Sequence, residues 1–370
     1  MIPVPFTKRG NRNRTYRFLY EKGVATRPEA ASALGLSLPT VSQYVQELQD
    51  AGLVEECGIL ESTGGRKPMA LRCRGDARVA IGLSLTPQGI SGTVINLLGD
   101  TLLSKKEPLS FSQSPDYLHG IATLTQTLAR EAGASPQALL GVAVAVPGIV
   151  DPTGDRITFS HVFPVGFSRK HLAAALPFPC RLCNDASAAG FAELWNRTQT
   201  GVTAYLSLNN TLGGAILANH AIYAGANHRA AEFGHLSISR DGPRCPCGQR
   251  GCLGCYCAAT VLSEDFDQDL DAFFAALAEG NSHAKVLWQE YLSYLSTGIA
   301  AIRAILDCEV ILGGDVGAQI APYLEELRQL VQQKSPFGDD GSFLQPCRHR
   351  HMASSVGAAL HLVDEFLDTI

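Results

Sequence analysis

Residues 235–257 read HLSISRDGPRCPCGQRGCLGCYC, and this stretch decides how the whole chain is interpreted. Five of the eleven cysteines fall within its last thirteen residues, beginning ten positions after His235. Zinc prefers four nitrogen or sulfur ligands in a tetrahedron, and thiolates two to five residues apart can wrap one ion. An iron–sulfur site and unmetallated, partly buried thiols are the alternatives. The candidate ligands are His235, Cys245, Cys247, Cys252, Cys255 and Cys257.

The composition bounds the class of protein. With 370 residues, 46% of them hydrophobic and 18% charged, the chain is long enough for two or three globular domains. No apolar run reaches the ~18–20 residues of a membrane span, and the first residues, MIPVPFTKRGNRNR, lack the apolar core of a signal peptide. We therefore expect a cytoplasmic protein without a membrane partner. A reducing cytosol disfavours disulfides, so metal binding is the leading interpretation of the cysteine cluster.

The net charge of −5 is unevenly distributed. Residues 1–74 hold eleven Lys or Arg against seven Asp or Glu, whereas the remainder holds nineteen against twenty-eight. A basic arm ahead of an acidic body suggests that the N-terminal end meets an anion such as DNA, although a merely solvated basic terminus is the alternative.

Three short helical patterns precede residue 55. The first covers 13–20, and the second has Thr26 as its N-cap, Pro28 in its first turn and Gly35 as its stop. The third, SLPTVSQYVQELQDAGLV (37–54), carries a single apolar stripe. Short polar side chains near the start of such a helix can reach base edges in a major groove. The candidate DNA-contacting residues off the stripe are Pro39, Thr40, Ser42 and Gln43.

A hairpin pattern follows the third helix. LVEECGIL (53–60) and MALRC (69–73) have strand composition, and STGGRKP (62–68) between them has turn composition. Three helices and a hairpin make a winged helix-turn-helix, here assigned to residues 1–74. Arg66 and Lys67 would then lie at the wing tip against phosphates or the minor groove of double-stranded operator DNA. The alternative is a small three-helix interaction module that does not bind DNA.

From about residue 76 strands and helices alternate. Strand patterns cover 79–85, 89–100 and 101–109, a helical stretch covers 116–132, and buried strand runs begin at 139 and 180. Two more strands are expected around a turn at Gly213–Gly214, and a strand, a Gly-rich turn and a helix span 310–331. The pattern predicts a two-lobed α/β fold whose ligand cleft lies at the carboxyl ends of the strands.

Five motifs in the body carry a resemblance. VPGIVD (146–151), NDASAA (184–189), AAEFGH (230–235), CPCGQRGCL (245–253) and ILGGD (311–315) follow a winged helix whose hairpin contains GGRKP. In this order they resemble the ROK family of repressors, open reading frames and kinases. The resemblance implies an actin/hexokinase-like, ribonuclease H-like body. Its first lobe is expected at 75–185 plus 355–370, and its second lobe, with the zinc loop, at 186–354.

The same resemblance narrows the metal ligands to His235, Cys245, Cys247 and Cys252. Four protein ligands leave no open position, so the Zn²⁺ is expected to be structural. Cys255 and Cys257 are then spare. They are expected to begin a helix as small apolar residues, although either could replace a ligand or make the patch redox-labile.

The resemblance also implies a carbohydrate site. The residues that match the family's sugar contacts are Gly148, Asn184, Asp185, Glu232 and His235. In the kinases of the family the aspartate at the position of Asp185 accepts a proton from a sugar hydroxyl. One departure is Gly254, which stands where the family has a further glutamate, so an acceptor is lost and the pocket is enlarged.

A second departure concerns ATP. The kinases carry a D-x-G-x-T-like turn after the first strand, whereas this chain has Ser84 for the Asp and Thr86 for the Gly. Their second phosphate loop, G-T-G-x-G-G-G, corresponds to NNTLGGA (209–215) here. Because Ser84–Gln88 lacks the carboxylate and the flexible turn, we expect no kinase activity. The function predicted is a sugar-responsive transcriptional regulator, acting as a repressor and as a homodimer or dimer of dimers. The alternatives are an active ATP-dependent sugar kinase and a regulator controlled by a protein partner.

Overall fold

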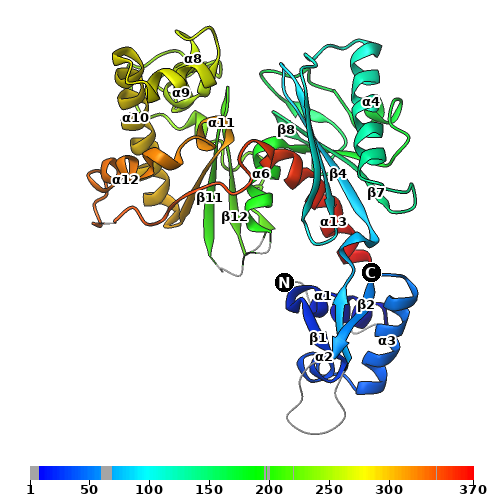
Figure 1. Cartoon of the computed structure of the whole chain (residues 1–370). Coiled ribbons are helices and arrows are strands. Elements are labelled where there is room, and N and C mark those ends of the chain that lie inside the picture. The colour runs from blue at the N-terminus through cyan, green and yellow to red at the C-terminus, as the bar shows by residue number, and fades with distance from the viewer. Residues whose placement is uncertain (1–7, 60–68, 196, 198–200, 220, 339) are drawn as a thin grey trace.

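The computed structural model describes residues 8–59, 69–195, 197, 201–219, 221–338 and 340–370 (Figure 1). Within them the chain forms a small N-terminal domain and a body of two lobes, each lobe built on a five-stranded sheet. This arrangement confirms the predicted fold class, a winged helix-turn-helix followed by a two-lobed α/β body. The predicted wing-tip residues, Arg66 and Lys67, lie outside the described residues.

The N-terminal domain contains three helices, and the second of them has the N-cap and the C-terminal glycine that the sequence predicted. The Thr26 side chain accepts from the Glu29 N–H while Glu29 bonds back to Thr26, and Gly35 ends the helix in the left-handed region at φ 64°. The order of the small antiparallel sheet is β1-β3-β2. The elements are α1 (Lys8–Lys22), β1 (Val24–Thr26), α2 (Arg27–Leu34), α3 (Leu38–Asp50), β2 (Val54–Ile59) and β3 (Met69–Cys73).

The first lobe has strand order β10-β7-β4-β5-β6, with β4, β7 and β10 parallel. One face packs on α4 and the other on α13 and α6. Glycine allows the close approach on the second face, because a Cβ on Gly82 would lie 1.8 Å from the Ser355 carbonyl oxygen. The elements are β4 (Val79–Leu85), β5 (Ile90–Asn96), β6 (Thr101–Glu107), α4 (Pro115–Glu131), β7 (Leu139–Val146), β8 (Ile149–Val150), β9 (Ile157–Phe159), α5 (Arg169–Ala173), β10 (Cys180–Asn184), α6 (Asp185–Leu194) and α13 (Ala353–Thr369).

The second lobe has strand order β13-β12-β11-β14-β15 and a helical layer around the buried Trp288. The longest helix in the described part of the chain, α10, lies in this layer, yet neither it nor another described helix is apolar enough over a sufficient length to cross a membrane. The elements are β11 (Val202–Leu208), β12 (Leu212–Ala218), β13 (Ala221–Ile222), α7 (Gly254–Cys257), α8 (Ala259–Ser263), α9 (Leu270–Ala278), α10 (Ser282–Leu306), β14 (Glu309–Gly313), α11 (Gly314–Gly317), α12 (Leu324–Gln332) and β15 (Leu344–Pro346).

The turn predicted at Gly213–Gly214 is wrong. The chain turns at residues 209–211, and both glycines lie inside β12, paired with Ser207 and Leu206 of β11. Gly214 serves close packing, because a Cβ there would lie 2.3 Å from the Phe233 ring. The glycine therefore lets the segment that carries residues 232–235 pack directly on the strand.

The N-terminal domain packs against the C-terminal helix of the body. The Arg12 guanidinium donates to the Ile370 carbonyl oxygen at 3.1 Å, and Arg17 pairs with Asp368. The Tyr20 hydroxyl donates to the Leu97 carbonyl oxygen at 2.9 Å, beside the edge-on ring of Trp195. Helix α13 thus joins the winged helix at one end to the core of the first lobe (Figure 1).

Candidate functional site

A cavity of about 290 Å³ lies between the two lobes. The first lobe contributes the segments that leave β7, β9 and β10, and the second lobe contributes β12 and the segment before the cysteine cluster. The carboxyl ends of parallel strands β7 and β10 meet here, as expected for ligand sites in α/β sheets. The structure brings together in this lining all five residues predicted for ligand binding, namely Gly148, Asn184, Asp185, Glu232 and His235.

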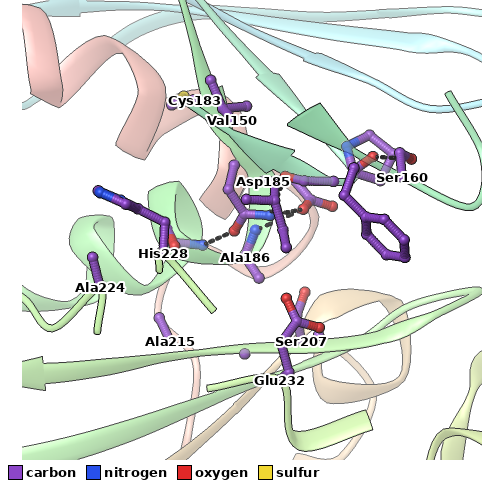
Figure 2. Close-up of a pocket in the computed structure, with 18 of the residues that line it drawn as sticks. Val150, Ser160, Cys183, Asp185, Ala186, Ser207, Ala215, Ala224, His228 and Glu232 are labelled. Atoms are coloured by element: carbon purple, nitrogen blue, oxygen red, sulfur yellow. Dashed lines mark hydrogen bonds between the residues drawn. The ribbon is translucent and has the colours of Figure 1, made fainter. Parts of the chain in front are cut away.

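Asn184 and Asp185 lie where β10 passes into α6 (Figure 2). Asn184 caps the helix, since its Oδ1 accepts from the Ser187 N–H at 2.8 Å and its Nδ2 donates to the Gly148 carbonyl oxygen at 2.9 Å. Asp185 Oδ1 accepts from the Ala186 N–H at 2.9 Å. Burial, with a smaller contribution from the nearby Glu232 carboxylate, raises the pKa of the Asp185 carboxyl to about 6. Asp185 Oδ1 also accepts from Asn184 Nδ2 at 3.3 Å, and the residue lines the cavity.

Gly148 adopts φ 144°, and a Cβ there would lie 2.7 Å from the Phe159 carbonyl oxygen. Ser160 fixes the neighbouring loop, because its hydroxyl donates to the Pro147 carbonyl oxygen at 2.7 Å and accepts from the N–H groups of residues 162 and 163. Only glycine lets the loop after β9 approach the end of β7 this closely. The loop then carries His161 into the cavity lining.

Glu232 and His235 enter the cavity from the second lobe (Figure 2 labels Glu232). Enclosure by the cleft raises the pKa of Glu232, while His235 and His161 act to lower it. The His235 ring lies 6.1 Å from the His161 ring, centroid to centroid. Carboxylates and imidazoles from both lobes therefore converge on one volume, an arrangement suited to a ligand with several hydroxyl groups.

Beside the cavity, four side chains form a potential metal site. The ligand atoms of His235, Cys245, Cys247 and Cys252 all lie within 4.8 Å of one another. His235 Nδ1 is 3.6 Å from Cys245 Sγ, and the sulfurs of Cys247 and Cys252 are 3.7 Å apart. Sulfurs bound to one tetrahedral zinc at ~2.3 Å would be about 3.8 Å apart, so the group fits that ion.

The loop backbone supports the same geometry. Gly251 has φ 68°, and a Cβ there would lie 1.7 Å from the Ser239 carbonyl oxygen. Burial raises the pKa of the Cys252 thiol to about 12, so this sulfur would become a thiolate ligand only beside a cation. The backbone and the donor set together show that these residues could hold a metal.

Cys255 and Cys257 are not members of the four-residue group. Both lie on the short helix α7, as expected of the spare cysteines. The Cys255 thiol points at the Arg244 carbonyl oxygen, 3.9 Å away, whereas Cys257 is fully buried beside Tyr291. Cys257 therefore serves as a small core residue.

The turns that would hold a nucleotide's phosphates are occupied by the chain's own groups. Thr86 accepts from the Gly89 N–H through its hydroxyl and also bonds to the Gly89 carbonyl oxygen, which closes the turn after β4. Asn209 Oδ1 accepts from the Asp315 N–H at 2.8 Å and lies 2.7 Å from the point where a Gly314 Cβ would be. Thr86 and Asn209 themselves do not line the cavity, whereas residues 211–215, which follow Asn209, do.

In the N-terminal domain, the predicted DNA-contacting residues lie in the first half of α3. Ser37 caps this helix, and Val41, Tyr44, Val45 and Leu48 are buried as predicted. Pro39 and Gln43 are exposed, while Thr40 and Ser42 are partly exposed. One helix face thus packs on the domain and leaves the predicted face accessible.

Several lining residues were missed by the sequence analysis, in particular His161, His228 and His361. Each belongs to a segment without a recognisable motif, so no spacing rule points to it. His361 lies on α13, and its ring stacks on Phe191 at 4.4 Å with 3° between the planes. Burial lowers the pKa of His361 to about 4, so this imidazole is neutral. Only the return of α13 to the first lobe brings it to the cavity.

Comparisons with known proteins agree with this geometry. Residues 80–365 match the ROK family, and residues 10–55 match a winged helix-turn-helix DNA-binding family. The chain is 25% identical to the xylose repressor of Bacillus subtilis, over 99% of this chain and 98% of that protein.

Two solved structures share the fold. A ROK family transcriptional regulator, a homologue of the Escherichia coli MLC protein, aligns with a TM-score of 0.76 and 19% identity, covering 97% of this chain and 98% of that one. The ROK hexokinase of Thermus thermophilus aligns with a TM-score of 0.62 and 26% identity, over 78% of this chain and 99% of the hexokinase. The regulator matches the whole chain, whereas the hexokinase matches the body alone.

Proposed function

The chain belongs to the ROK family, and from this premise we propose that it is a sugar-responsive transcriptional repressor. The observation that carries the proposal is the pairing, in one chain, of a winged helix-turn-helix with a cleft into which Asn184, Asp185, Glu232 and His235 converge. A relative that matches nearly end to end is a xylose repressor. The protein would bind double-stranded operator DNA through α3 and its wing, and a sugar or sugar derivative through the cleft.

The polar groups of the cleft suit a polyol. The carboxylates of Asp185 and Glu232 would accept hydrogen bonds from sugar hydroxyls, and those bonds would offset the desolvation that raises both pKa values. A zinc ion on His235 Nδ1 would fix the ring and leave Nε2 directed at the ligand. We assign a structural Zn²⁺ to His235, Cys245, Cys247 and Cys252, with no open position for a reacting group.

Sugar binding would reach the DNA-binding domain through two packed helices. Helix α6 begins at Asp185, and a Cβ on Gly357 of α13 would lie 1.7 Å from the Ala188 carbonyl oxygen of α6. Movement of α6 on closure would therefore displace α13, whose far end holds Arg12 and Arg17 of the winged helix. Paired winged helices in a dimer would then lose their match to two half-sites.

The alternative of an active sugar kinase rests on the fold shared with the hexokinase. Asp185 would be the base, but Ser84 supplies no carboxylate for Mg²⁺, and the chain itself occupies both phosphate turns. A regulator controlled by a protein partner is the third possibility, and Gly254 is its best support. The proposed repressor acts in the cytoplasm, where its operator lies.

A thermal-shift screen tests the proposal. The zinc-loaded protein is heated with monosaccharides, amino sugars and sugar phosphates, with and without Mg-ATP. A ligand at 100 times its Kd stabilises the protein by ~2.7 kcal/mol, which such a screen detects. A hit that is independent of ATP and lost in Asp185→Ala supports the repressor, and the same compound should release an operator fragment in a gel-shift assay. A hit that requires ATP supports the kinase, and no hit across the panel favours control by a partner.

A further inference from the structure

The interlobe cavity extends on both sides of the Asn184–Asp185 pair. In Figure 2 Ser160 lies on one side of Asp185, and His228 and Ala224 lie on the other. Phe159, His161 and Val162 flank Ser160 in the chain and Tyr223 precedes Ala224, and all four also line the cavity. The cavity therefore extends beyond the polar residues that suit one sugar ring.

Rings form a wall beside Ser160. The Phe159 ring packs edge-on against His161, with centroids 4.8 Å apart at 82°, and His161 in turn faces His235 across the cleft at 6.1 Å and 67°. Phe159 is 47% exposed and Val162 is 37% exposed, although both line the cavity. Exposed apolar side chains are ordinary when scattered, but here they gather at the mouth of a polar cavity.

The loop that carries this wall is held firmly. The Ser160 hydroxyl contacts the Pro147 carbonyl oxygen and the N–H groups of Val162 and Phe163, at 2.7 to 3.1 Å. Phe163 is buried and packs against Phe111 at 4.3 Å. Phe159 itself ends β9, where it pairs with Ile149 of β8, and this fixed loop follows it. Its exposed ring is therefore held in place, which lowers the entropy cost of a contact made there.

In the second lobe, Gly254 packs behind the segment that enters the cavity. Gly254 begins α7, and a Cβ there would lie 3.1 Å from the Gly234 carbonyl oxygen, between Glu232 and His235 in the chain. Gly254 therefore packs against the backbone of the segment that carries Glu232 and His235, and it is not among the residues that line the cavity.

We propose that the effector is a glycoside with two rings, whose sugar ring binds the polar cluster and whose second ring lies against Phe159 and His161. The second ring is a six-membered ring with an apolar face, either another sugar or an aryl group, because Phe159 and Val162 present exposed apolar side chains next to the His161 ring. The inference rests on the proposed sugar-binding function. It adds the size of the ligand and the part of the cavity that contacts the second ring.

The test measures binding by calorimetry to methyl glycosides, phenyl glycosides and disaccharides of glucose, xylose and N-acetylglucosamine. In the unmodified protein, at least one phenyl glycoside or disaccharide should bind 10-fold or more tightly than the matching methyl glycoside. Phe159→Ala should reduce this ratio to near one while methyl-glycoside binding stays within about twofold. The disaccharide and phenyl arms show which kind of second ring is preferred.

Tyr223→Ala is the matched control, because Tyr223 is an exposed aromatic residue, 57% accessible, beside Ala224 in the cavity lining. The ratio of two-ring to methyl-glycoside affinity in this variant should stay at the unmodified value. If methyl and two-ring ligands bind equally, or if Tyr223→Ala removes the preference instead of Phe159→Ala, the inference is wrong although the sugar function stands. Binding of no ligand in the panel overturns the inference and the sugar function together.

Discussion

The two sides of the interlobe cleft have diverged in opposite ways. On the sugar side, Asn184, Asp185, Glu232 and His235 line an open cavity, and burial leaves both carboxyls with raised pKa values. On the phosphate side, Thr86 accepts from the Gly89 N–H in the turn after β4, and Asn209, which follows β11, accepts from the Asp315 N–H in α11. The polar groups on the sugar side line the cavity and can bond to a ligand. The polar groups on the phosphate side bond to other groups of the chain.

This difference indicates what a kinase-like body needs when it serves as a sensor. Binding energy for a sugar can drive closure of the lobes, whereas phosphoryl transfer also needs a magnesium carboxylate and free backbone donors. A chain that loses only the second set of groups keeps the conformational response. The predictions below test the two sides separately.

Removal of the metal should have the largest effect and should act on the sugar side alone. Stripping zinc with a chelator, or Cys252→Ser, should lower the melting temperature of the body by about 10 °C and abolish sugar binding, because His235 loses its fixed orientation. Binding of an operator fragment without sugar should survive. Calorimetry measures the melting temperature and sugar binding, and gel shifts measure operator binding. Metal analysis checks the zinc content of each sample.

Cys255→Ser is the matched control for this prediction. Cys255 lies in the same loop but outside the four-residue group, so the variant should keep its zinc and its sugar affinity. Equal zinc loss in the Cys255 and Cys252 variants would show that the ligand assignment is wrong.

Asp185→Asn should weaken sugar binding at least 100-fold, about 3 kcal/mol, because a hydroxyl loses its carboxylate acceptor. The same change should stabilise the ligand-free protein at pH 8 by about 1–2 kcal/mol. Burial raises the folded pKa of Asp185 to about 6, above its ordinary value of 3.8, so the folded state holds the proton more tightly. Its contribution to stability is therefore full below pH 4 and is lost as the pH rises through 6.

Urea denaturation of the ligand-free protein from pH 4.5 to pH 8 measures this effect. The unmodified protein should lose stability relative to Asp185→Asn across that range, with the gap constant above pH 7. A gap that shrinks towards pH 8 would contradict the assigned shift.

Tyr20→Phe should have a smaller effect, confined to communication between the cleft and the DNA-binding domain. The hydroxyl bond to the Leu97 carbonyl oxygen is lost, while the ring can still pack on Trp195. One such bond contributes ~0.5–1.5 kcal/mol, so sugar should release the operator two- to tenfold less effectively. Sugar affinity measured on the protein without DNA should not change. An altered sugar affinity would mean that Tyr20 acts on the cleft itself.

The sequence predicted the fold and much of the site because both depend on local signals. The caps at Thr26 and Ser37, the stripe of α3 and the cysteine spacing each act within a few residues. The resemblance of short motifs then predicted the five residues that the cavity collects.

The remainder depended on contacts between distant segments. The turn at Gly213–Gly214 was predicted wrongly because a glycine pair typical of a turn serves here to admit the Phe233 ring. His161 and His361 reach the cavity through the loop after β9 and the return of α13, which no local pattern encodes. The docking of the winged helix on α13 likewise joins the two ends of the chain.

The smallest expected effect is on the phosphate side. Thr86→Gly opens the turn after β4, yet Ser84 still provides no carboxylate for magnesium, and Asn209 still bonds to the Asp315 N–H. Because Thr86 lies on an exposed turn, the variant should lose less than about 1 kcal/mol of stability. Neither it nor the unmodified protein should release ADP in a coupled assay with Mg-ATP and a bound sugar. Sugar-dependent ADP release from either protein would show that the phosphate side still works, and the contrast between the two sides of the cleft would then be one of degree.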